Sequence, residues 1–313
     1  MRQPRGQASD SVDSMELVVD AQGLVKRFGK VIALDGLDLV VRRGEVLGFL
    51  GPNGAGKTTA IRGLLGQLRF DKGTATVFGG DPWRDTIAIH ERLSYVPGDV
   101  SLWPGLTGGE CIDALLAFRG GDGRAKRDDL IARFDLDPTK RARTYSKGNR
   151  QKVALIAALA TDAELLLLDE PTSGLDPLME AQFRECVREA TGEGRTVLLS
   201  SHILGEVEAL CDRVTILRHG RAVATGTLDD LRGQTGTTVQ ATLDTIPAAA
   251  GELAGVSAMD VHPTDGRQRF TARATAEALP ELVRTLRGAG GTAWRVEPPS
   301  LDEVFLEHYE EDA

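Results

Sequence analysis

Apolar residues along the first hundred positions alternate with polar ones or form short continuous runs. This spacing is typical of β-strands, which place successive side chains on opposite faces. The segment 26–30 (KRFGK) predicts a turn between the first two strands, and helices are expected over 58–68 and near residue 87. The predicted strands lie at 16–20, 36–42, 45–50, 74–78 and 93–96.

The pattern becomes helical from about residue 98 to residue 160, where apolar positions recur at intervals of three and four. Downstream, short apolar runs alternate again with helical stretches, and this alternation implies a mostly parallel sheet with helices on its faces. The run 164–168 (ELLLL) suits a strand that is buried on both faces. The helices are expected at 107–118, 128–134, 152–159, 178–190 and 202–210, and the strands at 164–168, 196–200 and 213–217.

A further change of pattern follows residue 233, and no strong chemical motif occurs beyond it. We interpret this region as a small α+β appendage with a loop at 264–268. Ser300 is a good helix N-cap with Glu303 three residues later, so a short capped helix is expected at the end. The predicted elements are strands at 237–243 and 292–296 and helices at 275–287 and 300–308.

The segment 51–59 (GPNGAGKTT) fits the phosphate-loop pattern G-x-x-x-x-G-K-[ST] and lies between a predicted strand and a predicted helix. Glycines allow successive backbone N–H groups to turn inward around phosphate oxygens, and the helix N-terminus adds positive potential. Lys57 is expected to reach the β- and γ-phosphates, and the Thr58 hydroxyl to ligate Mg²⁺. The expected nucleotide-binding residues are Gly51, Pro52, Asn53, Gly54, Ala55, Gly56, Lys57, Thr58 and Thr59.

A pair of carboxylates ends the apolar run at 165–168. An acidic residue at the end of a buried strand beside a phosphate loop is placed to hold Mg²⁺, usually through water, and Asp169 is assigned that role. Glu170 follows immediately and is expected to act as general base on the attacking water. Catalysis is therefore assigned to Glu170 and Lys57, with the metal held by Thr58 and Asp169.

Five segments in one order give the chain a family resemblance. Together they resemble the nucleotide-binding subunit of an ABC transporter over about residues 16–231. The resemblance implies an α/β fold: a P-loop NTPase core of the ABC type, with an antiparallel β-subdomain and a helical subdomain. It also implies two copies that enclose two ATP molecules between them. The segments are GPNGAGKTT, YSKGNRQK (145–152), LLLLDEPT (165–172), SGLDP (173–177) and SSH (200–202).

The same resemblance assigns roles beyond the phosphate loop. Phe28 falls at the aromatic position that stacks on adenine, where a tyrosine is more usual. Ser146 and Gly148 fall where the γ-phosphate of the partner copy's ATP is contacted, and Asp176 where the two sites are linked. His202 falls at the position that contacts the γ-phosphate and holds the catalytic geometry, so it joins Glu170 and Lys57 as a catalytic residue.

Two departures from the family pattern stand out. The usual signature LSGGQ is YSKGN here, so that Lys147 places a charge where there is normally no side chain. Its expected effect is either added attraction to ATP or disturbed closure. The usual glutamine after the strand at 93–96 is Gly98, followed by Asp99. We hypothesise that Asp99 or water replaces the missing contact, or that coupling depends less on it.

Length, composition and charge limit the remaining possibilities. The 313 residues carry a net charge of −9, which argues against a nucleic-acid-binding surface. Cys111, Cys186 and Cys211 lack metal spacing and are expected to be reduced thiols. No apolar run approaches the ~20 residues that span a bilayer, and no signal peptide is found. We therefore expect a cytoplasmic protein, held at the membrane's cytoplasmic face by a separate transmembrane permease.

The domains expected are a disordered tail at 1–15, an ABC ATPase domain at 16–233 with its helical subdomain at about 98–160, and an accessory domain at 234–313. The ending 298–306 (PPSLDEVFL) resembles that of drug-resistance and other ABC-2-type exporters. The leading hypothesis is an ATPase, using ATP and Mg²⁺, that powers export of drugs or other small hydrophobic compounds. Alternatives are a soluble ABC ATPase without a transport role and an ATP-holding regulatory subunit. A Ras-like GTPase is disfavoured because no N-K-x-D pattern occurs.

Overall fold

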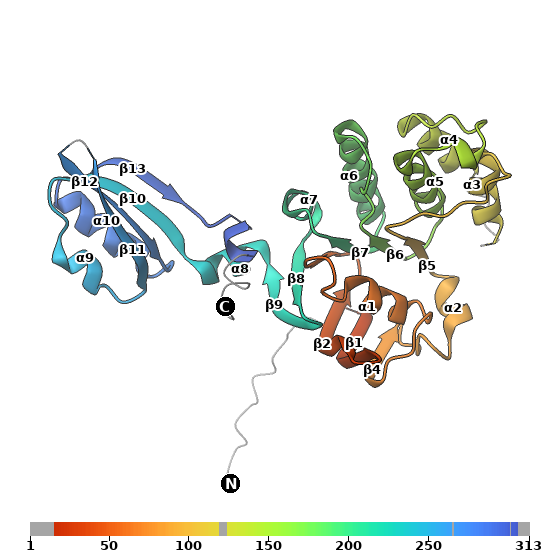
Figure 1. Ribbon diagram of the computed structural model, residues 1–313, viewed down its shortest axis with the longest axis horizontal. Coiled ribbons are helices and arrows are strands. Elements are labelled where there is room, and N and C mark those ends of the chain that lie inside the picture. Colours follow the sequence, from red (N-terminus) through yellow and green to blue (C-terminus); the bar gives the residue numbers. More distant parts are fainter. Residues whose placement is uncertain (1–15, 119–123, 265, 301, 306–313) are drawn as a thin grey trace, which may run out of the picture.

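The computed structural model describes residues 16–118, 124–264, 266–300 and 302–305, which form a larger part, called the ATPase part after its expected activity, and a smaller C-terminal part (Figure 1). The centre of the ATPase part is a six-stranded sheet in the order β5-β6-β7-β3-β8-β9. All its pairings are parallel except that of β8 with β9. Its strands are β3 (Val46–Leu50), β5 (Leu93–Val96), β6 (Leu165–Asp169), β7 (Thr196–Ser201), β8 (Arg213–Arg218) and β9 (Arg221–Thr227).

The two faces of this sheet bury different partners. Leu47, Leu167 and Leu198 belong to a cluster with apolar residues of α1 (Lys57–Leu64) and of a second, three-stranded sheet. Leu166 and Leu199 belong to another cluster, which includes residues of α5 (Lys147–Leu159), α6 (Pro177–Gly192) and α7 (Leu204–Leu210). Because neighbours in a strand face opposite ways, a continuous apolar run is what a sheet covered on both faces requires. The predicted parallel core is confirmed.

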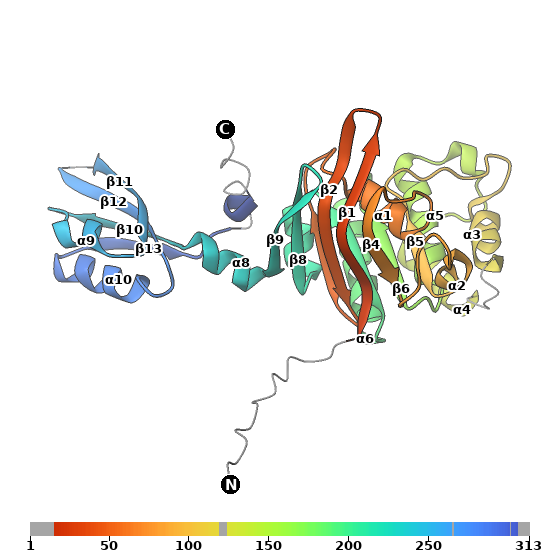
Figure 2. The same ribbon diagram turned by 90° about the horizontal axis from the view of Figure 1, so that it is seen from below.

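The second sheet is antiparallel, with the order β2-β1-β4, and contains β1 (Leu17–Phe28), β2 (Val31–Arg42) and β4 (Lys72–Val77). Its long hairpin of β1 and β2 extends past the central sheet in Figure 2. The predicted strands at 16–20 and 36–42 were too short, because residues 26–28 pair with β2 instead of forming a turn. Phe28 pairs with Val31, so the turn contains only two residues.

The helical part consists of α3 (Gly108–Ala117), α4 (Arg124–Arg133), the 3₁₀ helix η1 (Ala142–Thr144) and α5, with the short α2 (Thr86–His90) lying before β5. Thr107 begins α3 with a capping box: its hydroxyl accepts from the Glu110 N–H, and the Glu110 carboxylate accepts from the Thr107 N–H. These reciprocal bonds satisfy N–H groups that a helix start leaves free. The helix expected over 58–68 is shorter, since α1 ends at Leu64.

The C-terminal part is joined through α8 (Leu228–Thr235) and contains a four-stranded antiparallel sheet in the order β11-β12-β10-β13. With its two helices it has the βαββαβ order of ferredoxin-like folds. Sequence reasoning missed β9, β11 and β12, and the loop expected at 264–268 is the turn region of the β11–β12 hairpin. The elements are β10 (Thr237–Leu243), α9 (Ala248–Glu252), β11 (Val256–Thr264), β12 (Arg267–Ala274), α10 (Leu279–Gly288) and β13 (Thr292–Glu297).

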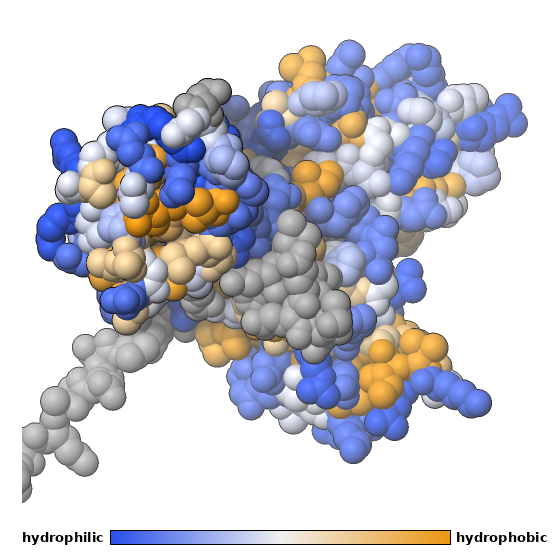
Figure 3. Space-filling view, turned by 60° about the vertical axis from the view of Figure 1, so that its left-hand side comes forward, coloured by the Kyte–Doolittle hydropathy of each residue, from blue (hydrophilic) through white to orange (hydrophobic). Residues whose placement is uncertain are grey.

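This small part buries its own cluster, built around Phe270, Leu282 and Leu286. Met259 and Val261 on one edge strand and Val296 on the other stay 45–48% exposed. Figure 3 shows apolar surface on this part, which faces forward in that view. The predicted fold class, an α/β core with a small α+β unit, is confirmed.

The chain returns to the ATPase part after β13. Val304 is fully buried in the same cluster as Leu231 of α8 and Ile216 of β8, and Phe305 packs against that cluster. Ser300 caps this last described turn, since its Oγ accepts from the Glu303 N–H at 3.2 Å. The capped helix expected at 300–308 is therefore found as far as residue 305, and residues 306–308 lie outside the described residues.

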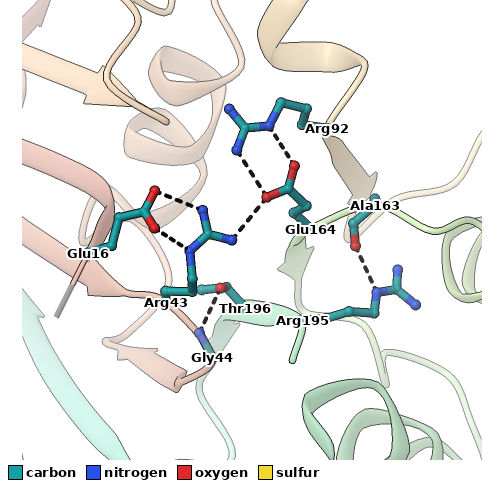
Figure 4. Close-up of polar contacts among 8 residues, drawn as sticks. All are labelled: Glu16, Arg43, Gly44, Arg92, Ala163, Glu164, Arg195 and Thr196. Atoms are coloured by element: carbon teal, nitrogen blue, oxygen red, sulfur yellow. Dashed lines mark hydrogen bonds and ion pairs between the residues drawn. The ribbon is translucent and has the colours of Figure 1, made fainter. Parts of the chain in front are cut away.

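An ion-pair network ties the two sheets together where strands begin and end (Figure 4). Glu164, just before β6, accepts two bonds from Arg92 at 2.6 and 2.9 Å and one from Arg43 at 3.0 Å. Arg43 also donates two bonds to Glu16, at 2.8 and 2.9 Å. The two guanidinium groups hold the pKa of Glu164 at about 2. Within the described ranges, no helix is both long and apolar enough to cross a bilayer.

Candidate functional site

The phosphate loop connects β3 to α1 and surrounds a cavity of about 140 Å³. Gly56 adopts φ 114°, a conformation that residues with a side chain rarely adopt. A Cβ there would lie 2.5 Å from the carbonyl oxygen of Ala33, so glycine is also required by space. The cavity is lined by Pro52, Asn53, Gly54, Gly56, Lys57, Thr58 and Thr59 of the loop, together with Ala33 and Glu170.

Lys57 begins α1 and is 4% exposed. Its Nζ donates to the carbonyl oxygens of Gly51 at 2.6 Å and Pro52 at 3.2 Å, and lies 3.6 Å from Glu170 Oε1. Burial lowers the pKa of this ammonium, while the neighbouring carboxylates Glu170 and Asp169 oppose that shift. A buried cation at a helix N-terminus suits a polyphosphate, because both the ammonium and the free helix N–H groups attract its negative charge.

Asp169 and Glu170 lie where β6 ends, beside the loop. Asp169 is 2% exposed, and its Oδ1 accepts from the Ser200 hydroxyl at 2.5 Å. Glu170 adopts φ 48°, a left-handed conformation that costs a residue with a side chain about 1–2 kcal/mol. Its N–H donates to the Ser200 carbonyl oxygen at 3.0 Å. Backbone strain of this kind persists only where surrounding contacts hold the residue in place, and it is concentrated at functional sites.

His202 follows β7 and brings a ring nitrogen to the same carboxylate. Its Nδ1 lies 3.4 Å from Glu170 Oε1, and its side chain is 48% exposed. The preceding Ser201 anchors the turn, since its hydroxyl donates to the buried Glu206 carboxylate at 2.6 Å and accepts from the Ile203 N–H. Burial raises the pKa of Glu206. The structure thus brings Lys57, Asp169, Glu170 and His202 to one end of the parallel sheet.

Gly98, at the position where the family pattern has glutamine, lies against the two carboxylates. A Cβ there would be 3.2 Å from the Asp169 carbonyl oxygen and 3.5 Å from Glu170 Cβ. The adjacent Pro97 carbonyl accepts from Gln151 of α5 at 3.3 Å. Asp99 is exposed. A side chain at position 98 would therefore lie in close contact with the segment that carries the proposed base, and α5 is bonded to the same loop.

Phe28 lies at the tip of the β1–β2 hairpin, with 48% of its surface exposed. Lys26 Nζ lies 5.5 Å from its ring centre. The hairpin reaches the phosphate loop through Ala33, which lines the phosphate cavity. Phe28 itself is not among the residues that line the cavity, and its role in stacking on adenine stays a prediction.

The signature residues lie apart from this cavity, at the start of α5. Ser146 caps the helix, its Oγ accepting from the Asn149 N–H at 3.2 Å. Gly148 is packed so closely that a Cβ there would lie 2.4 Å from the Gly174 carbonyl oxygen. Asp176 caps α6 by accepting from two N–H groups at 3.0 Å. None of these three residues lines the phosphate cavity of its own chain, as expected if they act on a second copy.

Sequence reasoning gave no role to Ser200 or Gln151. Ser200 joins Asp169 to Glu170, and Gln151 joins α5 to the loop beside them. Ser200 directly follows the buried run 196–199, so a polar residue at a buried strand end was the available signal. Gln151 carried no such signal, because its burial depends on the packing of α5.

Comparison with known proteins places this geometry in a family. Residues 34–173 match the model of the family described as ABC transporter. The daunorubicin resistance ATP-binding protein DrrA3 of Streptomyces coeruleorubidus is 40% identical over 304 residues, which cover 93% of this chain and 95% of that protein. The chain belongs to the ABC transporter family of ATP-binding proteins. ABC cassettes hydrolyse ATP, and the predicted enzyme class, an ATPase, is confirmed.

Solved structures agree with this assignment. A structure titled "Structure of ATP binding subunit of ABC transporter" is 32% identical, with a TM-score of 0.64 over 69% of this chain and 92% of that one. A dimeric bacterial ABC transporter cassette, 22% identical, has a TM-score of 0.61 over 67% of this chain and 98% of that one. At that identity the second likeness shows the fold alone. Both cover about the length of the ATPase part.

Proposed function

We propose that this chain drives the export of a drug-like, largely apolar compound through a separate transmembrane permease at the cytoplasmic face of the membrane. The observation that carries the proposal is the near full-length similarity to a daunorubicin resistance ATP-binding protein, which includes the C-terminal part. The alternatives are a soluble ABC ATPase without a transport role and an ATP-holding regulator, and the similarity to a drug-resistance protein favours neither of them.

In the proposed mechanism, the phosphate loop and Lys57 hold the β- and γ-phosphates of ATP, and Phe28 stacks on adenine. Thr58 and Asp169 would hold Mg²⁺, and the bound metal would supply positive charge to neutralise the phosphate oxygens. The residues fit a metal that takes few protein ligands and keeps several waters. Glu170 accepts a proton from the attacking water, and His202 contacts the γ-phosphate.

We further propose that two copies enclose two ATP molecules. In each site, Ser146 and Gly148 of one copy bind the phosphate that the other copy's loop holds, and Asp176 links the sites. The N-terminus of α5 supports this, because Ser146 and Lys147 are exposed there and no residue of α5 lines the phosphate cavity of its own chain.

This chain has a surface that suits contact with the permease. A groove of about 400 Å³ lies between α3, α5 and β5, and its lining includes Trp103, Leu115 and Phe118. Phe118 is 80% exposed and Trp103 is 45% exposed. Large exposed apolar side chains beside a groove mark a protein contact. We propose that a cytoplasmic segment of the permease, with apolar side chains, docks there.

The test compares ATP hydrolysis by the purified chain with that by Glu170→Gln, together with sizing in ATP and Mg²⁺. We expect turnover by the chain, and loss of turnover with an accumulating ATP-bound dimer for the variant. A second arm measures ATP-dependent daunorubicin uptake into everted vesicles that contain the chain and its candidate permease. If the native chain hydrolyses ATP but Glu170→Gln forms no ATP-bound dimer, the two-copy mechanism is contradicted. Unchanged turnover in Glu170→Gln would show that Glu170 is not the general base.

A further inference from the structure

Lys147 occupies the first position of α5, where the family pattern has a glycine. Its side chain lies over the backbone of the turn before α6: a Cβ on Gly174 would be 3.3 Å from Lys147 Cγ and 3.4 Å from its Cδ. At the end of the side chain, Nζ donates to the Ser173 hydroxyl oxygen at 2.6 Å. The ammonium therefore points to the 173–176 turn of its own chain.

This position is electrostatically unfavourable for a lysine. The N-terminus of a helix carries partial positive charge, so an ammonium in the first turn is repelled by the helix N–H groups. No acidic residue in the first turn of α5 compensates it. The Ser173 hydroxyl oxygen gives the ammonium an acceptor away from the helix axis. This hydrogen bond therefore fixes the conformation of the Lys147 side chain.

A second contact joins the same two segments. A Cβ on Gly148 would be only 2.4 Å from the Gly174 carbonyl oxygen, so the backbones of α5 and the turn are in direct contact. The 173–176 turn is also bonded to the proposed base, because the Ser173 N–H donates to the Glu170 carbonyl oxygen at 3.1 Å. Whatever fixes Ser173 therefore also restrains the segment that begins at Glu170.

We propose that Lys147 is a positioning residue that ties the N-terminus of α5 to the 173–176 turn within one chain, so that both segments meet a second copy as a single rigid surface. The expected effect of this contact on the rate of ATP hydrolysis rests on the proposed function. The geometry of the tie itself does not depend on it. A direct contact of the ammonium with ATP phosphate is the rival role.

The experiment measures amide hydrogen exchange of the peptide covering 170–178 and the kcat and KM for ATP. It uses Lys147→Ala, Ser173→Ala, their double variant and Lys147→Gln, which keeps an N–H donor without the charge. Arg143→Gln, an exposed charge close by, is the control. Loss of one such hydrogen bond is worth about fivefold. We expect each single variant and the double variant to speed exchange by about fivefold and lower kcat similarly, with KM retained and Lys147→Gln close to the native chain.

Several results would overturn the tie. One is an exchange rate for the peptide 170–178 that is the same in Lys147→Ala as in the native chain. Another is a double variant whose increase in exchange rate equals the product of the two single increases. A neutral Ser173→Ala combined with a defective Lys147→Gln would identify direct phosphate contact, since only the charge would then matter. If no form hydrolyses ATP, the proposed function fails while the exchange data still decide the tie.

Discussion

Replacement of Glu164 by glutamine tests whether the ion-pair network of Figure 4 stabilises the ATPase part. The change keeps the shape of the side chain and removes its charge, so Arg92 and Arg43 lose their shared carboxylate. The folded protein holds the pKa of Glu164 at about 2, against an ordinary value of 4.5. At full weight that gap corresponds to about 3 kcal/mol of stability.

Water reduces that figure, because the Glu164 side chain is 39% exposed. We therefore expect Glu164→Gln to lower the free energy of unfolding at pH 7 by about 1 kcal/mol. The sign follows from the direction of the shift. A carboxyl whose pKa is depressed in the folded state contributes its full stability above the unfolded value of 4.5, and loses it as pH falls towards about 2.

The assay is urea unfolding followed by far-UV circular dichroism, from pH 8 down to pH 3.5. The difference between the native chain and Glu164→Gln should be constant above about pH 5.5 and shrink below pH 4.5. Glu185→Gln, at an exposed position on α6, is the matched control and should leave stability unchanged. A difference that is absent at pH 7, or that stays constant as the pH is lowered, would refute the reasoning.

Three further changes address the site and the chain end. Ser200→Ala removes the hydroxyl that bonds Asp169, and should lower kcat about tenfold while ATP binding, measured by titration calorimetry, is retained. Val304→Ala, at a fully buried position, should cost about 2 kcal/mol in urea unfolding, and a surface-like cost below 0.5 kcal/mol would show that residue 304 does not pack as described. Gly98→Gln should raise permease-stimulated ATPase activity severalfold by adding an amide beside Glu170, since its Cβ would lie 3.5 Å from Glu170 Cβ. An unchanged rate would mean that water or Asp99 already supplies that contact.

Much of the ATPase part could be predicted because its sequence signals are local. Continuous apolar runs such as 164–168 identify buried parallel strands, and the phosphate loop combines a pattern with its strand and helix context. Parallel topology then brings together the residues at the carboxyl ends of the strands, because these ends lie on one side of the sheet. The residues so placed are Lys57, Asp169 and Glu170.

Other features depend on tertiary contacts that sequence patterns do not report. Strand β11 alternates poorly, and most of its residues are exposed, so only its pairing with β12 makes it a strand. The left-handed backbone of Glu170 and the capture of Lys147 by Ser173 likewise arise from segments far apart in sequence. No pattern within either segment contains that information.

The burial of Val304 against the ATPase part has a mechanical consequence. The C-terminal part is attached to the ATPase part at two places, through α8 and through the segment after β13, and residues of both belong to one apolar cluster. A body held at one point can turn about any axis, whereas one held at two neighbouring points turns chiefly about the line between them. We therefore expect the C-terminal part to rotate chiefly about that one axis, and cutting the chain after β13 should let it rotate about any axis.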